Sequence, residues 1–331
     1  MSRPKRARKA AAAPPEKLRQ GAASRHTGKV VAILSRKRSL YSTRRLVEAV
    51  KVRGHRALVL DTLRCNLILA RGNPRMTFRG VALRGVDVVI PRIGASITGY
   101  GLAVVNQFDM MGVTVLNNSV SIARSRDKLR CLQLVARAGL DIPRTVMARD
   151  RTNIPRLLED VGGLPAIVKL IRGTQGVGVM LASTLEELEG ILATFSDLGE
   201  EIVLQEFVAE SRGRDIRALV VGERVVAAMR RRARRGEFRS NLHRGGRGKA
   251  MTLPPAYAEA AVKAARVVGL EMAGVDMLET RRGPKVMEVN SSPGFEGLEE
   301  ATGVDIAGAI VEHALALAQA APVGARRRRV I

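Results

Sequence analysis

Short apolar runs alternate with amphipathic stretches in the first third of the chain, and this alternation restricts the possible folds more than any other feature of the sequence. Val30–Leu34 and Ala57–Leu60 are predicted strands, and residues 44–53 between them are a predicted helix. Val86–Ile90 is a third apolar run that ends in a polar loop. Because strands joined by a crossover helix pair in parallel, residues 29–120 are predicted to form an open α/β domain. Ligands of such domains bind at the carboxyl ends of the strands.

Two further units follow, and their patterns differ from the first. Residues 121–203 combine helices and strands around a glycine-rich loop, which predicts a small α+β lobe. Residues 204–320 contain apolar runs separated by glycines or charge clusters, with helices predicted at 257–268 and 305–319. This pattern predicts a mostly antiparallel sheet with helices packed on it. The predicted fold class is therefore α/β and α+β.

About half of the formal net charge of +25 lies at the two ends of the chain. Residues 1–29 hold nine Lys and Arg against one Glu, and residues 326–329 are four consecutive arginines. We expect residues 1–28 to be a basic disordered arm and residues 321–331 a basic tail, since runs of like charge repel and stay solvated. Contact with the ribosome, RNA or an acidic protein is the functional alternative.

Cysteine usage and hydropathy indicate a cytoplasmic protein with no membrane association. Cys65 and Cys131 have no metal-binding or redox spacing, so they are predicted to be reduced core residues. No apolar signal region follows the basic N-terminus. The apolar segment 304–321 contains Asp305 and Glu312, which favour an amphipathic helix over a membrane span.

Two carboxylates and an amide lie within predicted strands near the C-terminus. Glu288 and Asn290 are two residues apart, so their side chains share one face of a strand. Asp276 belongs to an earlier apolar run that is able to lie beside this strand. Because hard cations such as Mg²⁺ prefer carboxylate and amide oxygens, the pattern predicts a metal site. Solvated charges at strand ends are the alternative, which the apolar surroundings of both carboxylates weaken.

Residues 172–178 form a loop with three glycines, including Gly173 and Gly176, between two predicted strands. Glycine lets backbone N–H groups approach an anion closely, so such loops hold phosphates. Lys169 ends the preceding apolar strand, where it needs an anionic partner. A structural hairpin rich in glycine explains the loop equally well, and the Walker sequence is absent.

Another group of polar residues lies between the glycine loop and the predicted metal site. The segment Gln205-Glu206-Phe207 ends a strand and suits a nucleotide hinge, with Glu206 or Asp215 accepting hydrogen bonds from ribose hydroxyls. Core packing of Phe207 and a surface ion pair between Asp215 and Arg217 are the alternatives. The polar loop 238–246 carries cations and an amide, which suit anion binding.

Taken in order, these residues resemble the ATP-grasp superfamily and, within it, the RimK family, whose members ligate L-glutamate to the C-terminus of the small-subunit ribosomal protein six. The resemblance covers residues 29–316. It rests on separate motifs, which are Ile33-Leu34-Ser35, Leu40-Tyr41-Ser42, Pro91-Arg92-Ile93-Gly94, Gly173-Thr174-Gln175-Gly176, residues 238–246 and residues 286–294.

The resemblance implies an ATP-grasp fold with an N-terminal pre-ATP-grasp domain at residues 29–120. It also implies ATP-binding residues: Lys128, Lys169, Gly173 and Gly176 at the phosphates, Glu206 and Phe207 at the adenine, Asp215 at the ribose, and Arg239, Ser240 and Asn241 on the nucleotide and phosphate side. The implied ligands of two Mg²⁺ or Mn²⁺ ions are Asp276, Glu288 and Asn290. The candidate catalytic residues, which would stabilise an oxyanion, are Arg217, Arg239 and Asn241.

The implied reaction joins a carboxylate to an amine through an acyl phosphate, because a carboxylate oxide is a poor leaving group. The substrates are ATP, L-glutamate and ribosomal protein six or another acidic C-terminus, and RimK relatives suggest a tetramer. The basic tails and the run Arg230–Arg235 exceed the usual charge of the family, so the acceptor stays open. Two alternatives are a related ligase acting on a carrier protein or small molecule, and a ribosome- or nucleic-acid-binding protein with an ATP site. The absence of Trp leaves few platforms for stacking bases.

Overall fold

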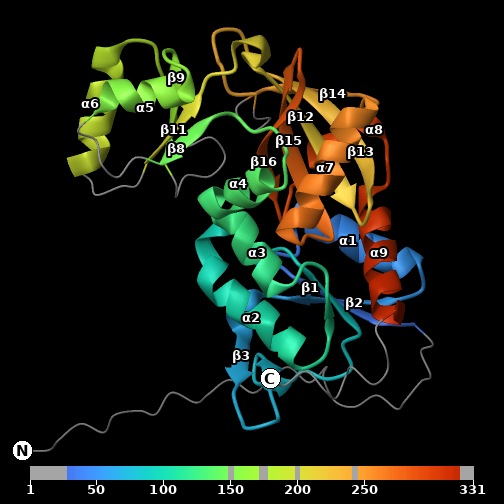
Figure 1. The fold of residues 1–331 in the computed structure, drawn as a ribbon. Helices are drawn as coiled ribbons and strands as arrows, with labels where there is room; N and C mark the ends of the chain where they lie inside the picture. The colour runs from blue at the N-terminus through green and yellow to red at the C-terminus, as the bar shows by residue number, and fades with distance from the viewer. Residues whose placement is uncertain (1–27, 148–152, 171–177, 198–201, 241–244, 321–331) are drawn as a thin grey trace, which may run out of the picture.

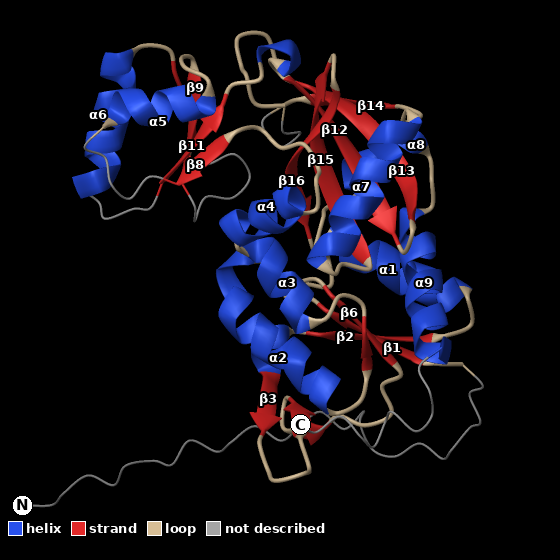
Figure 2. Ribbon diagram, in the orientation of Figure 1, coloured by secondary structure: helices blue, strands red, loops and turns tan. Residues whose placement is uncertain are grey.

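The computed structural model describes residues 28–147, 153–170, 178–197, 202–240 and 245–320. These residues form an N-terminal α/β domain, a large lobe around an antiparallel sheet, and a small lobe (Figure 1). The small lobe projects to one side of the large lobe, while the N-terminal domain lies below it in the view of Figure 2.

The N-terminal domain is built on a parallel sheet, which confirms the predicted α/β class. Its strands are, in spatial order, β2 (Arg56–Leu60), β1 (Val30–Leu34), β6 (Val88–Pro91) and β7 (Thr114–Val115). The covering helices are α1 (Tyr41–Val52) and α2 (Thr98–Met110). Val31 and Ile33 pack in one core with α1, and Ala32 and Leu34 pack in another with α2. Burial of both faces explains why β1 is one unbroken apolar run.

The domain also carries a small antiparallel sheet that the hydropathy pattern did not predict. Its strands are β3 (Cys65–Ile68), β4 (Arg75–Phe78) and β5 (Val81–Ala82). Single 3₁₀ turns occur here and elsewhere, at η2 (Thr62–Arg64), η3 (Ala95–Ile97) and η4 (Ala209–Ser211). Strands this short and this exposed leave almost no period-two signal in the sequence.

The small lobe is a four-stranded antiparallel sheet covered by two helices. The strands are, in spatial order, β10 (Val179–Ala182), β9 (Ala166–Leu170), β11 (Ile202–Glu206) and β8 (Thr145–Met147). The helices are α5 (Ile154–Val161) and α6 (Leu185–Asp197). The predicted boundary between residues 203 and 204 falls inside β11. Strands β9 and β10 flank residues 171–177 and hold Lys169 opposite Val179.

The large lobe has a five-stranded antiparallel sheet, as the apolar runs predicted. The strands are, in spatial order, β14 (Arg247–Ala250), β13 (Arg224–Arg232), β12 (Arg214–Val221), β15 (Met272–Thr280) and β16 (Gly283–Asn290). One face packs on α7 (Pro255–Val268), with α3 (Ser119–Arg126) and α4 (Lys128–Arg137) beside it. The helices after the sheet are α8 (Glu296–Thr302) and α9 (Ile306–Ala320). Residues 119–137 thus pack on the large lobe rather than on the small one.

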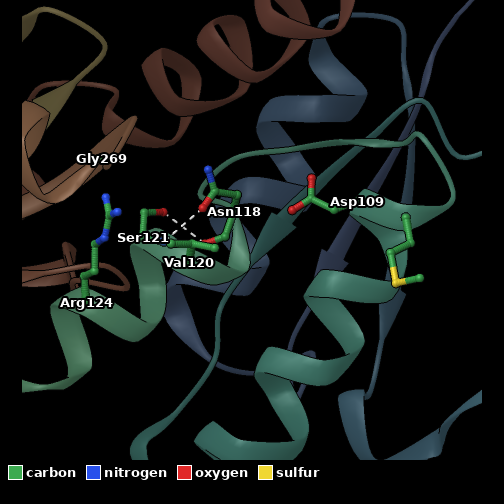
Figure 3. A pocket seen from close by; sticks show the side chains of 7 residues that line it. Asp109, Asn118, Val120, Ser121, Arg124 and Gly269 are labelled. Carbon is green, nitrogen blue, oxygen red and sulfur yellow. Dashed lines mark hydrogen bonds between the residues drawn. The ribbon is translucent and has the colours of Figure 1, made fainter. Parts of the chain in front are cut away.

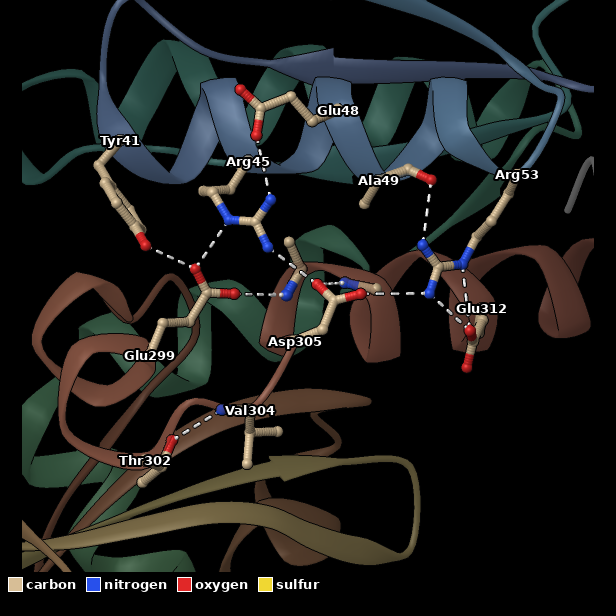
Figure 4. A network of polar contacts seen from close by, with 12 residues as sticks. Tyr41, Arg45, Glu48, Ala49, Arg53, Glu299, Thr302, Val304, Asp305 and Glu312 are labelled. Atoms are coloured by element: carbon tan, nitrogen blue, oxygen red, sulfur yellow. Dashed lines mark hydrogen bonds and ion pairs between the residues drawn. The ribbon is translucent and has the colours of Figure 1, made fainter.

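Helix α9 joins the N-terminal domain to the large lobe. Its apolar residues share one core with α1 and β1 on one side and with β12 and β13 on the other. A polar network reinforces this junction (Figure 4). Glu299 accepts hydrogen bonds from the Tyr41 hydroxyl at 2.7 Å and from Arg45 Nε at 3.0 Å, and Asp305 accepts from Arg45 and Arg53. The parallel sheet of the N-terminal domain and the antiparallel sheet of the large lobe are therefore held as one unit.

Within the described part of the chain, no single helix has the length and apolarity needed to cross a membrane. Helices α8 and α9 meet those two criteria only as a pair, and a bend of 114° separates them.

Candidate active site

Strands β15 and β16 bring the predicted metal ligands together. Asp276 lies directly opposite Glu288 in the register of the two strands. Asn290 follows Glu288 by two residues, and Val289 between them is buried in the core on the other face. Among the described residues, Glu288 has no hydrogen-bond or ion-pair partner. The sequence prediction of one shared face for these three side chains is confirmed.

Asp276 is the centre of a buried network of charges. Arg217 donates two hydrogen bonds to its carboxylate, from Nε at 2.7 Å and from Nη2 at 2.6 Å. Arg231 Nη2 lies 3.0 Å from the same carboxylate. Burial alone would raise the pKa of Asp276, but the two guanidinium groups outweigh it and hold the pKa below its usual value. The carboxylate is therefore ionised although it is 2% exposed.

Asp215 belongs to the same network through Arg231. Arg231 donates from Nε and Nη2 to the Asp215 carboxylate at 2.6 and 2.7 Å, and the Ser240 hydroxyl donates to that carboxylate as well. Burial works to lower the pKa of Arg231, whereas Asp276 and Asp215 raise it above its usual value. Asp215 and Arg217 thus form ion pairs across the sheet to separate partners, and the alternative of a surface pair between them is wrong.

Arg231 is a site residue that the sequence analysis did not single out. It lies in the basic run Arg230–Arg235, where sequence alone makes every arginine look alike. In β13 the side chains alternate, so Arg231 is 2% exposed while Arg230 and Arg232 face solvent. Register counted from the β12–β13 turn would have placed Arg230 opposite Asp215, because a β-bulge between Leu219 and Val220 shifts the pairing by one residue and brings Arg231 there instead.

Lys169 and Lys128 bring positive charge to the other side of Glu288. Lys169 Nζ donates to Gln205 Oε1 at 2.6 Å. Burial lowers the pKa of Lys169 to about 8; Glu288 opposes this effect and Lys128 adds to it. Burial also lowers the pKa of Lys128, again against the attraction of Glu288. Both lysines are therefore close to Glu288 and are held in surroundings where an anion would stabilise their charged forms.

Arg239 and Ser240 connect the loop after β13 to the small lobe and to the charge network. Arg239 Nη1 donates to the backbone oxygen of Val179 at 3.3 Å, in the strand opposite Lys169. Its Nε and Nη2 donate to Glu237, and this pairing lowers the pKa of Glu237 to about 2. The predicted residues Gly173, Gly176 and Asn241 lie outside the described residues.

Glu206 is the last residue of β11 and Phe207 follows it, where the small lobe meets the large one. The Glu206 carboxylate accepts from Lys285 Nζ at 2.7 Å and from the backbone nitrogen of Arg144 at 2.9 Å. Burial raises the pKa of Glu206, but these donors, led by Lys285, bring it below its usual value. Phe207 is half-buried beside this pair. Lys285 is a further residue that the sequence analysis missed, and it fixes the hinge segment to β16.

A cavity of about 360 Å³ lies away from these residues, between the end of α2 and the start of α3. Its lining includes Asp109, Asn118, Ser121 and Arg124 (Figure 3). None of the predicted site residues lines it. Within the described residues, no cluster of three or more His, Cys, Asp or Glu side chains is arranged to hold a metal, so the candidate site depends on the amide of Asn290 as well as on carboxylates.

Family models match almost the whole described chain. A model described as the RimK PreATP-grasp domain matches residues 30–122, and one described as the RimK-like ATP-grasp domain matches residues 125–314. A protein of Pseudomonas aeruginosa named "Probable alpha-L-glutamate ligase" is 53% identical over 283 residues, which are 86% of this chain and 94% of that protein. A protein of the same name from Azotobacter vinelandii has the same identity and coverage.

Solved structures share the fold at lower sequence identity. The ATP-grasp ligase PsnB complexed with its minimal precursor is 22% identical, with a TM-score of 0.70 over 88% of this chain and 99% of that one. The macrocyclase MdnC of Microcystis aeruginosa, bound with its precursor peptide MdnA, is 18% identical, with a TM-score of 0.68 over 87% of this chain and 99% of that one. These similarities confirm the predicted fold.

Proposed function

Because the chain belongs to the RimK family of ATP-grasp ligases, we propose that it uses ATP and Mg²⁺ or Mn²⁺ to add L-glutamate to the C-terminus of a protein, with ribosomal protein six as the acceptor. The observation that carries this proposal is the position of Glu288. It lies opposite Asp276 on one side and close to Lys169 and Lys128 on the other. The residues proposed as metal ligands and the lysines proposed to bind phosphate thus lie around one carboxylate.

The donor set fits a hard divalent cation. Glu288 and Asn290 offer oxygen ligands on one face of β16, and Glu288 has no protein partner among the described residues. Asp276 and Asn290 would complete the set of ligands. A bound Mg²⁺ or Mn²⁺ ion supplies positive charge against phosphate oxygens as charge develops during transfer.

The protein residues serve mainly to hold and orient the substrates. A carboxylate oxygen of the acceptor attacks the γ-phosphorus of ATP, and the bond between that phosphorus and the β,γ-bridging oxygen breaks. ADP departs, and the acceptor carries an acyl phosphate. The amine of glutamate then attacks the acyl carbon, loses a proton, and expels phosphate. Lys128 and Lys169 would hold the phosphates, and Arg217, which is bonded to Asp276, would stabilise the oxyanion.

The nucleotide base would lie at the junction of the two lobes, next to Glu206 and Phe207. The link from Glu206 to Lys285 keeps the end of β11 next to β16, so base and phosphates would bind to one rigid frame. The ribose would lie near Asp215, whose carboxylate is held in place by Arg231 and Ser240. Arg239 and Asn241 would complete the phosphate side.

Intact-mass spectrometry tests this function directly. Ribosomal protein six is incubated with the enzyme, ATP, Mg²⁺ and L-glutamate, and its mass is expected to rise in steps of one glutamyl unit. Glu288→Gln, which keeps the shape of the side chain but removes its charge, is expected to abolish the steps. Glu296→Gln, at an exposed glutamate of α8, is the matched control and should retain them.

The outcomes separate the parts of the proposal. Glutamate-dependent ADP release without a change in the mass of ribosomal protein six would mean that another carboxylate, which in this mixture is that of glutamate itself, is activated. A carrier protein or a small carboxylate metabolite would then be tested as the acceptor in its place. The same mass steps with Glu288→Gln would contradict the assignment of the metal site. Replacing Mg²⁺ by Mn²⁺ in the same assay determines which ion supports the reaction.

A further inference from the structure

Arg92 is a half-buried cation that the proposed roles above do not use. It follows β6 directly, at the carboxyl end of the parallel sheet. Its Nη2 donates to the backbone oxygen of Pro293 at 2.6 Å and to the Ser42 hydroxyl at 3.3 Å, and its guanidinium lies 5.6 Å from the centre of the Phe295 ring. Its Nε and Nη1 are buried and have no hydrogen-bond partner among the described residues. Two donors of one charged group are thus left without an acceptor.

Arg126 lies next to Arg92, and it too has a buried nitrogen without a hydrogen-bond acceptor among the described residues. Its Nη2 donates to the backbone oxygen of Ile93, the residue after Arg92, while its Nε is buried and has no partner in the described ranges of the chain. Burial lowers the pKa of both arginines; the neighbouring charge of Arg126 lowers that of Arg92 further, to about 10, and Glu288 opposes the shift for Arg126. The Ser125 hydroxyl, next to Arg126 in α3, donates to the backbone oxygen of Val289 at 2.8 Å, so the pair lies beside the strand that carries the proposed metal ligands.

The hydroxyls of Ser291 and Ser292 add to this set of unsatisfied groups. They follow Asn290, the last proposed metal ligand, and both hydroxyls are buried without a partner in the described part of the chain. The bond from Arg92 to Pro293 places this segment beside the first arginine. The backbone nitrogen of Ser291 donates to the Ser125 hydroxyl, which places it beside the helix that carries Arg126.

Unpaired buried donors and two adjacent guanidinium groups are costly in an empty protein, and an anion that accepts their hydrogen bonds removes the cost. The planar fork of arginine matches a carboxylate with two parallel hydrogen bonds. We propose that Arg92 and Arg126, with the Ser291 and Ser292 hydroxyls, form the subsite that binds the carboxylates of the incoming amino acid. This inference rests on the proposed ligase function.

The chemistry of the reaction favours the amino acid over the acceptor as the source of the carboxylate. The carboxylate of the acceptor is consumed, because it becomes the acyl phosphate. Glutamate reacts through its amine and keeps both carboxylates, so both need partners throughout the reaction. Arg92, at the carboxyl edge of the N-terminal sheet, and Arg126, at the end of α3, supply one cation for each. Arg126 follows Ser125, whose hydroxyl donates to the backbone oxygen of Val289, so an amino acid bound to Arg126 would lie next to the proposed metal ligands.

The test uses Arg92→Gln and Arg126→Gln in the full chain, with KM measured separately for glutamate, ATP and the acceptor. Loss of a charge-assisted pair predicts a rise in the KM for glutamate of about 10- to 100-fold in each variant. The KM values for ATP and acceptor are expected to stay near those of the wild type. Arg84→Gln and Arg130→Gln, at exposed arginines near each site in sequence, are the matched controls and should leave all three constants unchanged.

Calorimetric binding of L-glutamate, L-glutamine and the α-amide of glutamate to the Mg²⁺–AMPPNP complex gives a readout that is independent of turnover. The wild type should bind L-glutamate more tightly than either amide. Each arginine variant should lose this preference over the amide that lacks the carboxylate bound by the replaced arginine. A rise in the KM for the acceptor instead of glutamate, or unchanged binding of all three ligands in both variants, would overturn the inference. If glutamate binds as predicted but no acceptor is extended, the subsite stands and the proposed acceptor fails.

Discussion

The depressed pKa of Lys169 makes a quantitative prediction about stability. Burial lowers the pKa from 10.5 to about 8, a shift that costs the folded chain about 3 kcal/mol at pH 7. The unfolded chain binds this proton up to pH 10.5, whereas the folded chain releases it near pH 8. The free energy of unfolding should therefore rise with pH between 8 and 10.5, because the unfolded state holds more protons in that window.

Lys169→Met removes this titration. The difference in unfolding free energy, wild type minus variant, is expected to increase by about 2 kcal/mol between pH 8 and pH 10. The variant also leaves Gln205 Oε1 without its donor, but this cost is the same at every pH. It therefore cancels when the stability difference at pH 8 is subtracted from that at pH 10. Urea unfolding followed by circular dichroism at several pH values measures it, since the chain has no Trp for fluorescence.

The matched control is Lys51→Met, which removes an exposed lysine from α1 and should follow the wild-type profile. A difference between wild type and Lys169→Met that stays constant from pH 8 to pH 10 would refute the reasoning. It would mean that Lys169 is solvated in the free protein. In that case its surroundings do not favour an anion, and its role in holding phosphate loses its physical basis.

Three further predictions concern stability and reactivity. Arg231→Met leaves two buried carboxylates without their shared cation and should lower the free energy of unfolding by about 3 to 5 kcal/mol in urea titrations. Glu299→Gln weakens the junction of α1 with α8 and α9 and should cost about 1 to 3 kcal/mol, measured in the same way. Burial raises the pKa of Cys65 and of Cys131 to about 12, so neither thiol should react with Ellman's reagent at pH 8 until the chain unfolds.

Exposed neighbours provide the controls for the first two variants. Arg232→Met and Glu300→Gln change residues that face solvent, and each should alter stability by less than about 0.5 kcal/mol. Equal losses of unfolding free energy in Arg231→Met and Arg232→Met would contradict the buried network. Equal losses in Glu299→Gln and Glu300→Gln would contradict the role of Glu299 at the junction of α1 with α8 and α9. For the cysteines, modification of the folded chain at the rate of a free thiol would contradict their burial.

Much of the fold was predictable because its strands have clear apolar periods. The parallel sheet follows from runs buried on both faces, and the meeting of Asp276 with Glu288 follows from two adjacent apolar runs with carboxylates inside them. The small sheet β3–β5 was not predictable, because strands of two to four half-exposed residues leave no period.

The partners of the charged residues were predictable only in part. Asp215 and Arg217 are two residues apart, and that spacing suggested a pair with each other. Side chains two apart on a strand do share a face, but each also meets a residue of a neighbouring strand at shorter range. Long-range register therefore decided the pairing, with Arg231 from β13 and Asp276 from β15. Register of this kind is specified by turns and bulges far from the residues concerned.

The network around Asp276 assigns different tasks to its two arginines. Arg231 bonds both Asp215 and Asp276 and is almost fully buried, so moving it would leave two buried carboxylates without their shared cation. Arg217 bonds Asp276, and its side chain is 19% exposed, so it is the partner able to yield when a cation or an oxyanion arrives. Arg217→Met is therefore expected to lower the rate of ligation with a smaller loss of stability than Arg231→Met. Urea unfolding and turnover measured on both variants test this. A loss of stability with Arg217→Met as large as that with Arg231→Met would mean that Arg217 has a structural role rather than a role in the reaction.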